Sequence, residues 1–457
     1  MSAPGKLRLL AKVLVVNAGL ALAGAFPAGA ETLADALVSA YRTSGLLEQN
    51  RALLRAADED VAQATAALRP VLNYTLASNY SSISETTMSN LQLSAKMVLF
   101  DFGRSKLRRE IARENVLSLR AALAGVEQKV LLRAVSAYAG VQRDQAIAQL
   151  RRKNVTLIAE QLRAARDRFD LGQATRTDVA FAEARLAAAK SALAAARGNL
   201  AVSREEYRAV TGHYPASLAA LPKPPATAHS AAAALEIARR NNPDLLQAQH
   251  SARVADLNQE LAMAAVRPTL AGQAQATVDQ DRRDSSSVGL VLSGPIYQGG
   301  ALAAKARKAA AQRDAARAGL HLAASGVEQK VNAAWARLAV ADAGLKANAE
   351  QVRAARLALR GVREEADVGS RTILDVLNAE QDLSDAETRR VSAGTDRYLA
   401  VYNLLSAMGI LSAEHLKLGV PVYDPQAYYN AVSRAPAYRV SPEGQRLDGV
   451  LKALGRN

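Results

Sequence analysis

The residue types that carry most enzymatic chemistry are sparse in this sequence. The five histidines are isolated from one another: His213, His229, His250, His321 and His415. There is no cysteine, which excludes thiolate zinc ligands, thiol catalysis and disulfide bonds. The glycine pair Gly299-Gly300 stands outside any phosphate-binding loop motif. We therefore expect no catalytic residue, no cofactor, no metal site and no enzyme.

Two glycine-containing turns and the charged residues beside them are better candidates for a functional role. Gly172 and Gly369 permit the backbone conformations that close a helical hairpin. Arg371 and Asp375 are four residues apart, which is the spacing of an ion pair within one helix. What these residues can do depends on the helices and strands that position them.

The N-terminal segment has the pattern of a secretory signal peptide. Three basic residues precede an apolar run from Val13 to Leu22, and Ala28-Gly29-Ala30 resembles a cleavage site. The run is shorter than the roughly 20 residues that a spanning helix needs. We expect residues 1–30 to be removed and the mature chain to begin at Glu31, in an exported protein.

The composition favours closely packed helices over a conventional core. Aromatic residues make up 4% of the chain, and alanine is abundant. The formal net charge of +15 is spread along predicted helices among carboxylates, without a basic stripe that alternates with aromatic residues. We therefore expect no nucleic-acid partner.

The sequence contains the same pattern twice. Arg69-Pro70 recurs as Arg267-Pro268, and Gly212 is matched by Gly409. A proline-rich linker, which cannot be helical, separates the two copies. The predicted divisions are the signal peptide 1–30, a first repeat 31–220, the linker 221–230, a second repeat 231–410, and a C-terminal segment 411–457 whose polar end is expected to be mobile.

One repeated hexamer does not obey this register. GVEQKV begins at Gly125 and again at Gly326, four residues out of the spacing that relates the other matches. Either each copy carries compensating insertions of one helical turn, or the hexamer is a coincidence.

Each repeat is predicted to run helix, two strands, very long helix, turn and helix. The first helix, Leu33 to Leu68, ends before Pro70 because proline disfavours a helical preceding residue. Apolar and polar residues alternate in four segments, as expected for strands with one apolar face. These segments are 72–76, 90–99, 269–278 and 287–297, joined in pairs by polar loops at 81–89 and 279–286.

Four such strands are suited to a transmembrane β-barrel with an apolar exterior and a polar lumen. A pair of soluble hairpins is the alternative, but no other segment offers their apolar face a partner. Because a barrel needs about eight or more strands, four strands cannot close alone. The pattern predicts an oligomer.

The two long helices, about Arg104 to Phe169 and Ala301 to Ala366, are each on the order of 100 Å long at 1.5 Å per residue. In the second, large residues recur every seven positions and mostly small residues follow each by three, which predicts a coiled-coil seam. The large set is Val331, Leu338, Leu345, Val352 and Leu359, and the second set is Ala334, Ala341, Asn348, Ala355 and Val362.

Four segments resemble the TolC-like outer-membrane efflux proteins. They are LSGPIYQGG from Leu292 and VGSRTILDVL from Val368, with the first-repeat counterparts LFDFG from Leu99 and RFDLGQATRTDV from Arg168. The resemblance implies a mixed fold: a homotrimer in which each chain gives four strands to one twelve-stranded barrel, continued by an α-helical coiled-coil barrel. The linker and the C-terminal segment would form an equatorial girdle.

The resemblance also implies an outer-membrane location with a periplasmic extension, and a function. The protein would be the exit duct of a tripartite efflux pump or a type I secretion system. Its partners would be outer-membrane lipid, a periplasmic adaptor protein and an inner-membrane transporter of the RND or ABC type. The alternative is a soluble periplasmic coiled-coil protein without a pore.

Functional residues of the family can be carried onto matching positions of this chain. The adaptor would contact the exposed turn tips Leu171, Gly172, Gln173, Val368, Gly369 and Ser370. Arg371 would link to Thr177 and Asp178 across helices and hold the tunnel entrance closed, and Asp375 would form an acidic pore ring. Two departures predict a looser and less cation-binding entrance: the family's tyrosine is absent near Ala366, and Asn378 stands where a second acidic ring is common.

Overall fold

A computed structural model describes residues 30–435 except Ser84, Arg282 and Val422, together with residues 442, 445, 446 and 449. The predicted signal peptide, up to residue 29, and most of the predicted mobile end of the C-terminal segment therefore lie outside the described residues. The described chain forms two compact units. Over the described residues, the first comprises 30–40, 134–223 and 355–391, and the second comprises 41–133, 224–354 and 392–435.

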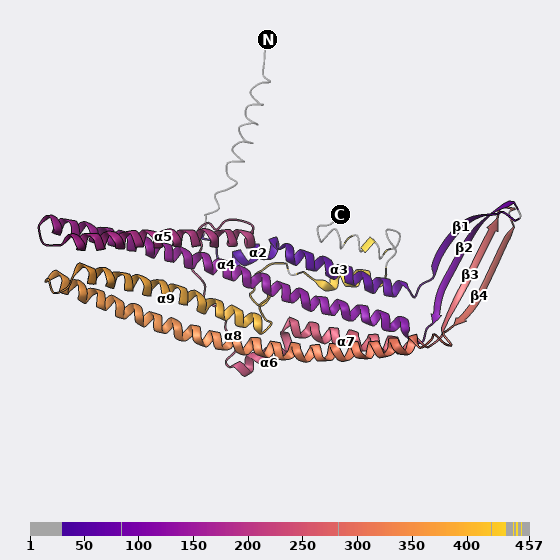
Figure 1. Ribbon diagram of the computed structural model, residues 1–457. Helices are drawn as coiled ribbons and strands as arrows, with labels where there is room; N and C mark the ends of the chain where they lie inside the picture. Colours follow the sequence, from indigo (N-terminus) through magenta and orange to yellow (C-terminus); the bar gives the residue numbers. More distant parts are fainter. Residues whose placement is uncertain are drawn as a thin grey trace, which may run out of the picture. The chain divides into compact units, whose positions relative to one another are not determined.

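The order of elements is the same in the two halves of the chain (Figure 1). Each half runs through two short helices, two strands, one long helix and a final helix. The first half contains α2 Leu33–Thr43, α3 Gly45–Ala66, β1 Val71–Ser81, β2 Thr86–Phe100, α4 Arg104–Asp170 and α5 Arg176–Thr211. The second contains α6 Ala231–Asn241, α7 Pro243–Ala264, β3 Thr269–Asp279, β4 Asp284–Ser293, α8 Ala301–Asp367 and α9 Ile373–Ala407, and the short helix α10 Pro425–Val432 follows.

The prediction of a single helix from Leu33 to Leu68 is wrong, because the chain breaks at Ser44. The Ser44 hydroxyl accepts a hydrogen bond from the Leu47 amide and so caps a new helix, α3. The second half breaks at the same place in the repeat, where Asn242 caps α7 and Pro243 takes the first helical position. At each break, the capping side chain accepts hydrogen bonds from amides that a continuous helix would have bonded to backbone carbonyls.

The four strands form one antiparallel sheet in the order β1-β2-β3-β4. The register puts apolar residues opposite apolar residues, since Leu93 lies opposite Tyr74 and Ala276. Polar residues likewise face polar residues, as Gln92 does with Thr75 and Thr277. The predicted alternation is therefore confirmed across the sheet, with one apolar face and one polar face.

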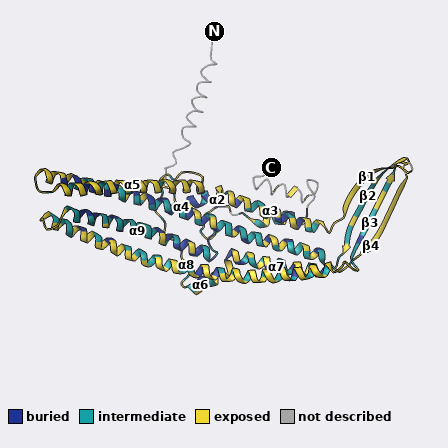
Figure 2. Ribbon diagram, viewed as in Figure 1, coloured by how far each residue is buried: buried dark blue, intermediate teal, exposed yellow. Residues whose placement is uncertain are grey.

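That apolar face is uncovered within the chain. The exposed fraction is 69% for Leu72 and 70% for Leu290, and Figure 2 shows mainly exposed residues along β1 and β4. The outer edges of β1 and β4 pair with no strand among the described residues. The sheet thus leaves both an apolar surface and two rows of backbone hydrogen-bonding groups without partners in one chain.

Two strands depart from the prediction near their C-terminal ends. β4 ends at Ser293 and not at Tyr297, because Pro295 has no amide hydrogen to donate to a strand ladder. Gly294 also packs closely against Pro268: a Cβ added to Gly294 would lie 3.0 Å from the Pro268 Cα. In β2, a register irregularity between Val98 and Phe100 leaves Leu99 unpaired. Neither feature changes the alternation in hydrophobicity, so the sequence pattern did not indicate them.

Helices α4 and α8 are equally long, at 67 residues each. The predicted seam of α8 is confirmed as its inward stripe: all of its positions are buried or half-buried, with Val331, Val352 and Leu359 at most 5% exposed. Because both helices are unbroken and equal in length, the two GVEQKV segments simply occupy positions one turn apart. Within the described residues, no helix is long and apolar enough to cross a membrane.

The turn after α9 gives a test of packing in the second unit. Gly409 has a φ of +81°, and a Cβ there would lie 2.4 Å from the Asn241 carbonyl oxygen. Gly369 has the same φ, but an added Cβ would meet nothing within 4 Å. Both alanine variants carry the left-handed penalty of about 1–2 kcal/mol, and only Gly409→Ala adds a backbone clash.

We expect Gly409→Ala to lower the apparent melting temperature of the purified protein several degrees further than Gly369→Ala does. Circular dichroism of the helices during heating measures both shifts. Equal shifts for the two variants would show that the close approach to Asn241 does not limit stability.

Candidate functional site

The predicted tip residues lie in two turns of the first unit that have the same geometry. The α4–α5 turn is closed by hydrogen bonds from the Gly172 amide to the Phe169 carbonyl and from the Gln173 amide to the Arg168 carbonyl. The α8–α9 turn repeats both bonds, with donors Gly369 and Ser370 and acceptors Ala366 and Glu365. The φ of Gly172 is +73° and that of Gly369 is +81°, so each turn uses a glycine at its left-handed position.

The apolar residue of each tip points away from the core. Leu171 is 72% exposed and Val368 is 80% exposed. Each tip therefore presents one exposed apolar side chain beside its glycine turn, which is a small apolar contact surface. The two tips lie at the same end of the first unit (Figure 1).

The carboxylates predicted for the gate and the pore ring are both helix caps. At the start of α5, the Asp178 carboxylate accepts from the Thr175 amide at 2.9 Å, while the Thr175 hydroxyl accepts from the Asp178 amide at 3.2 Å. Thr372 and Asp375 make the same reciprocal bonds at the start of α9. These bonds lower the pKa of both carboxyl groups, so each stays ionised at neutral pH.

The sequence analysis missed these capping boxes, although a signal for them was present. Threonine stands three residues before the aspartate in both copies, at Thr175 and Thr372, which is a pattern typical of a helix start. Asp178 and Asp375 are therefore equivalent positions of the two repeats. Helix capping alone explains why a threonine stands three residues before each of these aspartates.

Arg371 lies before the first residue of α9 and not within the helix. It donates to Glu365 at 2.7 Å, across the turn that joins α8 to α9. The spacing argument for an ion pair with Asp375 is therefore wrong, because Arg371 precedes the capping residue Thr372. Thr177 is exposed in the first turn of α5.

Ion pairs join the two helices within each hairpin. Arg166 binds Glu183 in the first hairpin at 2.6 Å, and Arg363 binds Glu380 at the equivalent place in the second. Glu380 has a side chain that is only 3% exposed, so its carboxylate needs this cation. The duplicated pairs indicate that each hairpin is fixed just behind its tip.

The two hairpins are also joined to each other. Arg185 on α5 donates to the Asn378 side chain on α9 at 2.6 Å, and Arg151 on α4 binds Asp385 on α9 at 2.9 Å. The same three helices, α4, α5 and α9, contribute an apolar core of three alanines and three larger aliphatic residues: Ile158, Leu162, Ala165, Ala182, Ala189 and Leu377. Asn378 is thus occupied by an arginine of its own chain.

The site is made of helix caps, ion pairs and an apolar core. Over the residues that the structure covers, no group of three or more histidines and acidic residues is placed to hold a metal ion. The charged residues described above take part in helix caps, hairpin ion pairs and links between the hairpins. What the geometry provides is a rigid, charged end on two paired hairpins.

A duplicated chain that joins an open membrane-type sheet to long helical hairpins defines a channel subunit. A family model described as outer membrane efflux protein matches residues 37–213 and 234–410, so the chain belongs to this family. The matched segments span both copies of the internal repeat. The family consists of channel proteins.

Individual relatives agree with this assignment. The outer membrane efflux protein BepC of Brucella suis is 35% identical over 438 residues, covering 92% of this chain and 95% of its own. TolC of Vibrio cholerae is 28% identical over 406 residues, covering 84% and 92%. The open-state MtrE channel of Neisseria gonorrhoeae superposes with a TM-score of 0.74 at 21% identity, over 83% of this chain and 89% of that one. The predicted fold class, strands of a β-barrel continued by a helical tunnel, is confirmed.

The capping box of α9 can be tested by hydrogen exchange at the tip. We expect Thr372→Ala to remove about 1 kcal/mol of capping energy and to speed amide exchange in the first turn of α9. Thr388→Ala is the matched control, because the Thr388 hydroxyl bonds only the Ser384 carbonyl inside the same helix. Exchange at the tip that is equally slow in both variants would contradict a stabilising cap.

The same cap predicts a pH dependence. The pKa of Asp375 is lower in the folded protein than in the unfolded chain, so its contribution is complete above the unfolded pKa of about 3.9. The contribution is lost as the pH falls through the folded pKa. Protection of the first turn of α9 should therefore weaken in acid in the wild type and change less in Thr372→Ala.

Proposed function

We propose that three copies of this chain form an outer-membrane channel that serves as the exit duct of an efflux or type I secretion system. The observation that carries the proposal is the sheet, which has two unpaired edges and an uncovered apolar face. Lipid can cover the face, but only another strand can satisfy an edge. Closure with further copies answers both requirements at once.

The number of copies follows from the size of a closed barrel. Two copies would give eight strands, which side chains nearly fill, whereas three would give twelve and leave room for a passage. Cyclic symmetry then pairs β4 of each copy with β1 of the next, and no edge remains. This supports the homotrimer, in which the polar face with Gln92 and Gln273 lines the lumen.

The two repeats, 31–220 and 231–410, would then contribute equivalent wall segments to each trimer. The linker 221–230 and the segment from residue 411 would belong to the equatorial girdle. In support, α10 packs on α3, where the Tyr428 hydroxyl donates to Glu59 at 2.6 Å. A duct of this kind has no energy source of its own, so an inner-membrane transporter of the RND or ABC type would drive export through a periplasmic adaptor.

The adaptor would dock on the hairpin tips at residues 171–173 and 368–370. The exposed Leu171 and Val368 support this assignment, because they are apolar and otherwise lack a partner surface at the tip. The gate would be formed between neighbouring copies, where Arg371 could exchange Glu365 for Thr177 or Asp178. Asp375 is ionised at neutral pH, so three copies at the entrance would present a negative ring, while Asn378 would add no charge.

The barrel is tested by placing arginine on each face of the sheet. Leu93→Arg and Ala274→Arg should impair assembly strongly, because arginine at the lipid midplane costs roughly 2–4 kcal/mol. Gln92→Arg and Gln273→Arg, one residue away on the polar face, are the controls. The measurement is the yield of heat-modifiable oligomer in the outer-membrane fraction.

Equal tolerance of arginine on the two faces would overturn the barrel. A freely soluble wild-type monomer in the periplasm would instead favour the coiled-coil protein without a pore.

The gate is tested by single-channel conductance in planar bilayers. Arg371→Ser should raise conductance, because a few hydrogen bonds of roughly 0.5–1.5 kcal/mol each can keep an open state rare. Asp375→Ala should leave the closed conductance similar and reduce cation selectivity. Glu365→Gln is the control for the contact seen within one chain, and it should leave the latch intact or strengthen it.

A wild-type conductance in Arg371→Ser would reject the latch. Unchanged selectivity in Asp375→Ala would reject the acidic ring and leave the latch standing.

A further inference from the structure

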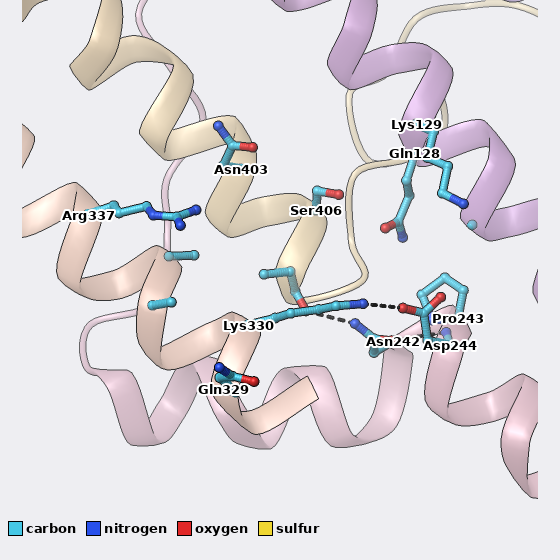
Figure 3. Close-up of a pocket in the computed structure, with 14 residues that line it drawn as sticks. Gln128, Lys129, Asn242, Pro243, Asp244, Gln329, Lys330, Arg337, Asn403 and Ser406 are labelled. Carbon is cyan, nitrogen blue, oxygen red and sulfur yellow. Dashed lines mark hydrogen bonds and ion pairs between the residues drawn. The ribbon is translucent and has the colours of Figure 1, made fainter. Parts of the chain in front are cut away.

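A pocket in the second unit brings the two GVEQKV segments together (Figure 3). It has a volume of about 470 Å³, which is within the range of small-molecule sites. Gln128 and Lys129 of α4 line it, and Gln329 and Lys330 of α8 line it as well. These are the same dipeptide of the hexamer in its two copies. The channel function assigns no role to them.

The pocket carries an excess of positive charge. Lys330 forms an ion pair with Asp244 at the start of α7, with a distance of 2.7 Å between nitrogen and oxygen. Lys129 and Arg337 also line the pocket, and neither has an acidic partner within the part of the chain that the structure describes. One ion pair and two uncompensated cations leave a net charge near +2. A doubly charged anion would balance it.

Gln128 supplies a hydrogen-bonding side chain to the same pocket. The residue as a whole is only 6% exposed, its amide makes no hydrogen bond to any residue that the structure describes, and its amide atoms remain accessible to solvent in the pocket. Figure 3 shows this amide pointing into the pocket from α4, while Arg337 enters from α8. An amide aimed into a pocket in this way can donate a hydrogen bond to a ligand that displaces the water there.

The floor of the pocket is preformed. The Asn242 side chain accepts hydrogen bonds from the amides of Asp244 and Leu245 and donates to the Ala407 carbonyl at 2.9 Å. These bonds use the first amides of α7, so side chains and not the helix terminus must recognise the ligand. A Cβ on Gly125 would lie 3.4 Å from the Pro243 Cβ, which shows how closely α4 and α7 approach here.

We propose that this pocket binds a small organic molecule that carries a doubly charged oxyanion, of the phosphate monoester or dicarboxylate class. Arg337 and Lys129 neutralise the anion, and the Gln128 amide donates a hydrogen bond to it. A guanidinium matches two oxygens of either group, which makes Arg337 the principal contact. Ser406 and Asn403 on α9 line the same pocket and suit a polar body on the ligand.

The test uses the full-length protein purified in detergent and isothermal titration calorimetry. The probes are glycerol 3-phosphate and succinate, with glycerol and acetate as controls of lower charge. We expect saturable binding of at least one dianion, no measurable binding of glycerol, and weaker binding as salt rises. The dianion that binds more tightly shows whether the ligand is of the phosphate monoester or the dicarboxylate class.

Three variants locate the binding. Arg337→Gln and Lys129→Gln should each weaken it at least tenfold, and Gln128→Leu should weaken it while preserving the helical content. Arg353→Gln is the matched control, since Arg353 is an exposed residue of the same helix that pairs with Glu350. Oligomer content and conductance of the variants are measured separately, so a failed channel would not be mistaken for a failed site.

The absence of binding by both dianions would overturn the proposal. Binding that is as strong in Arg337→Gln as in Arg353→Gln would also overturn it, because the anion would then be held by general surface charge.

Discussion

The structure depends on one constraint, which is that every backbone hydrogen-bonding group placed in lipid needs a partner in protein. A four-stranded antiparallel sheet meets this requirement at its two inner strands and fails it at β1 and β4. The uncovered apolar face shows that the sheet is not built to pack on a core of its own chain. In the proposed channel, oligomerisation is what supplies the missing strand partners.

The long helices pack against one another with few large side chains. Their contacts rely on alanine and on a seam in which large residues alternate with mostly small ones, so backbones can lie close together. Polar links then give the hairpins a defined register, as Arg166–Glu183 and Arg363–Glu380 do in the two repeats. Because the chain is duplicated, these features occur twice, and the two hairpin tips share the same turn and the same helix cap.

The repeats have also diverged, and the divergence is where specific properties arise. Asn378 on α9 binds Arg185 of its own chain. The GVEQKV segments lie one turn apart on equally long helices and meet around a pocket that no repeat symmetry requires. A duct wall that only needed to be impermeable would not need a pocket lined by Lys129 and Arg337, two cations without an acidic partner among the described residues.

The sequence by itself determined the order of elements, the two faces of the strands, the long helices with their seam and the family. These follow from periodicity and turn residues, which are local properties of the chain. Only the tertiary structure decided that Arg371 binds Glu365 and that Arg185 binds Asn378. Helical spacing shows which residues share a face, but the partner of a long charged side chain depends on how the chain turns and on what packs against it. For the same reason, the breaks at Ser44 and Asn242 and the meeting of the two hexamers became visible only in three dimensions.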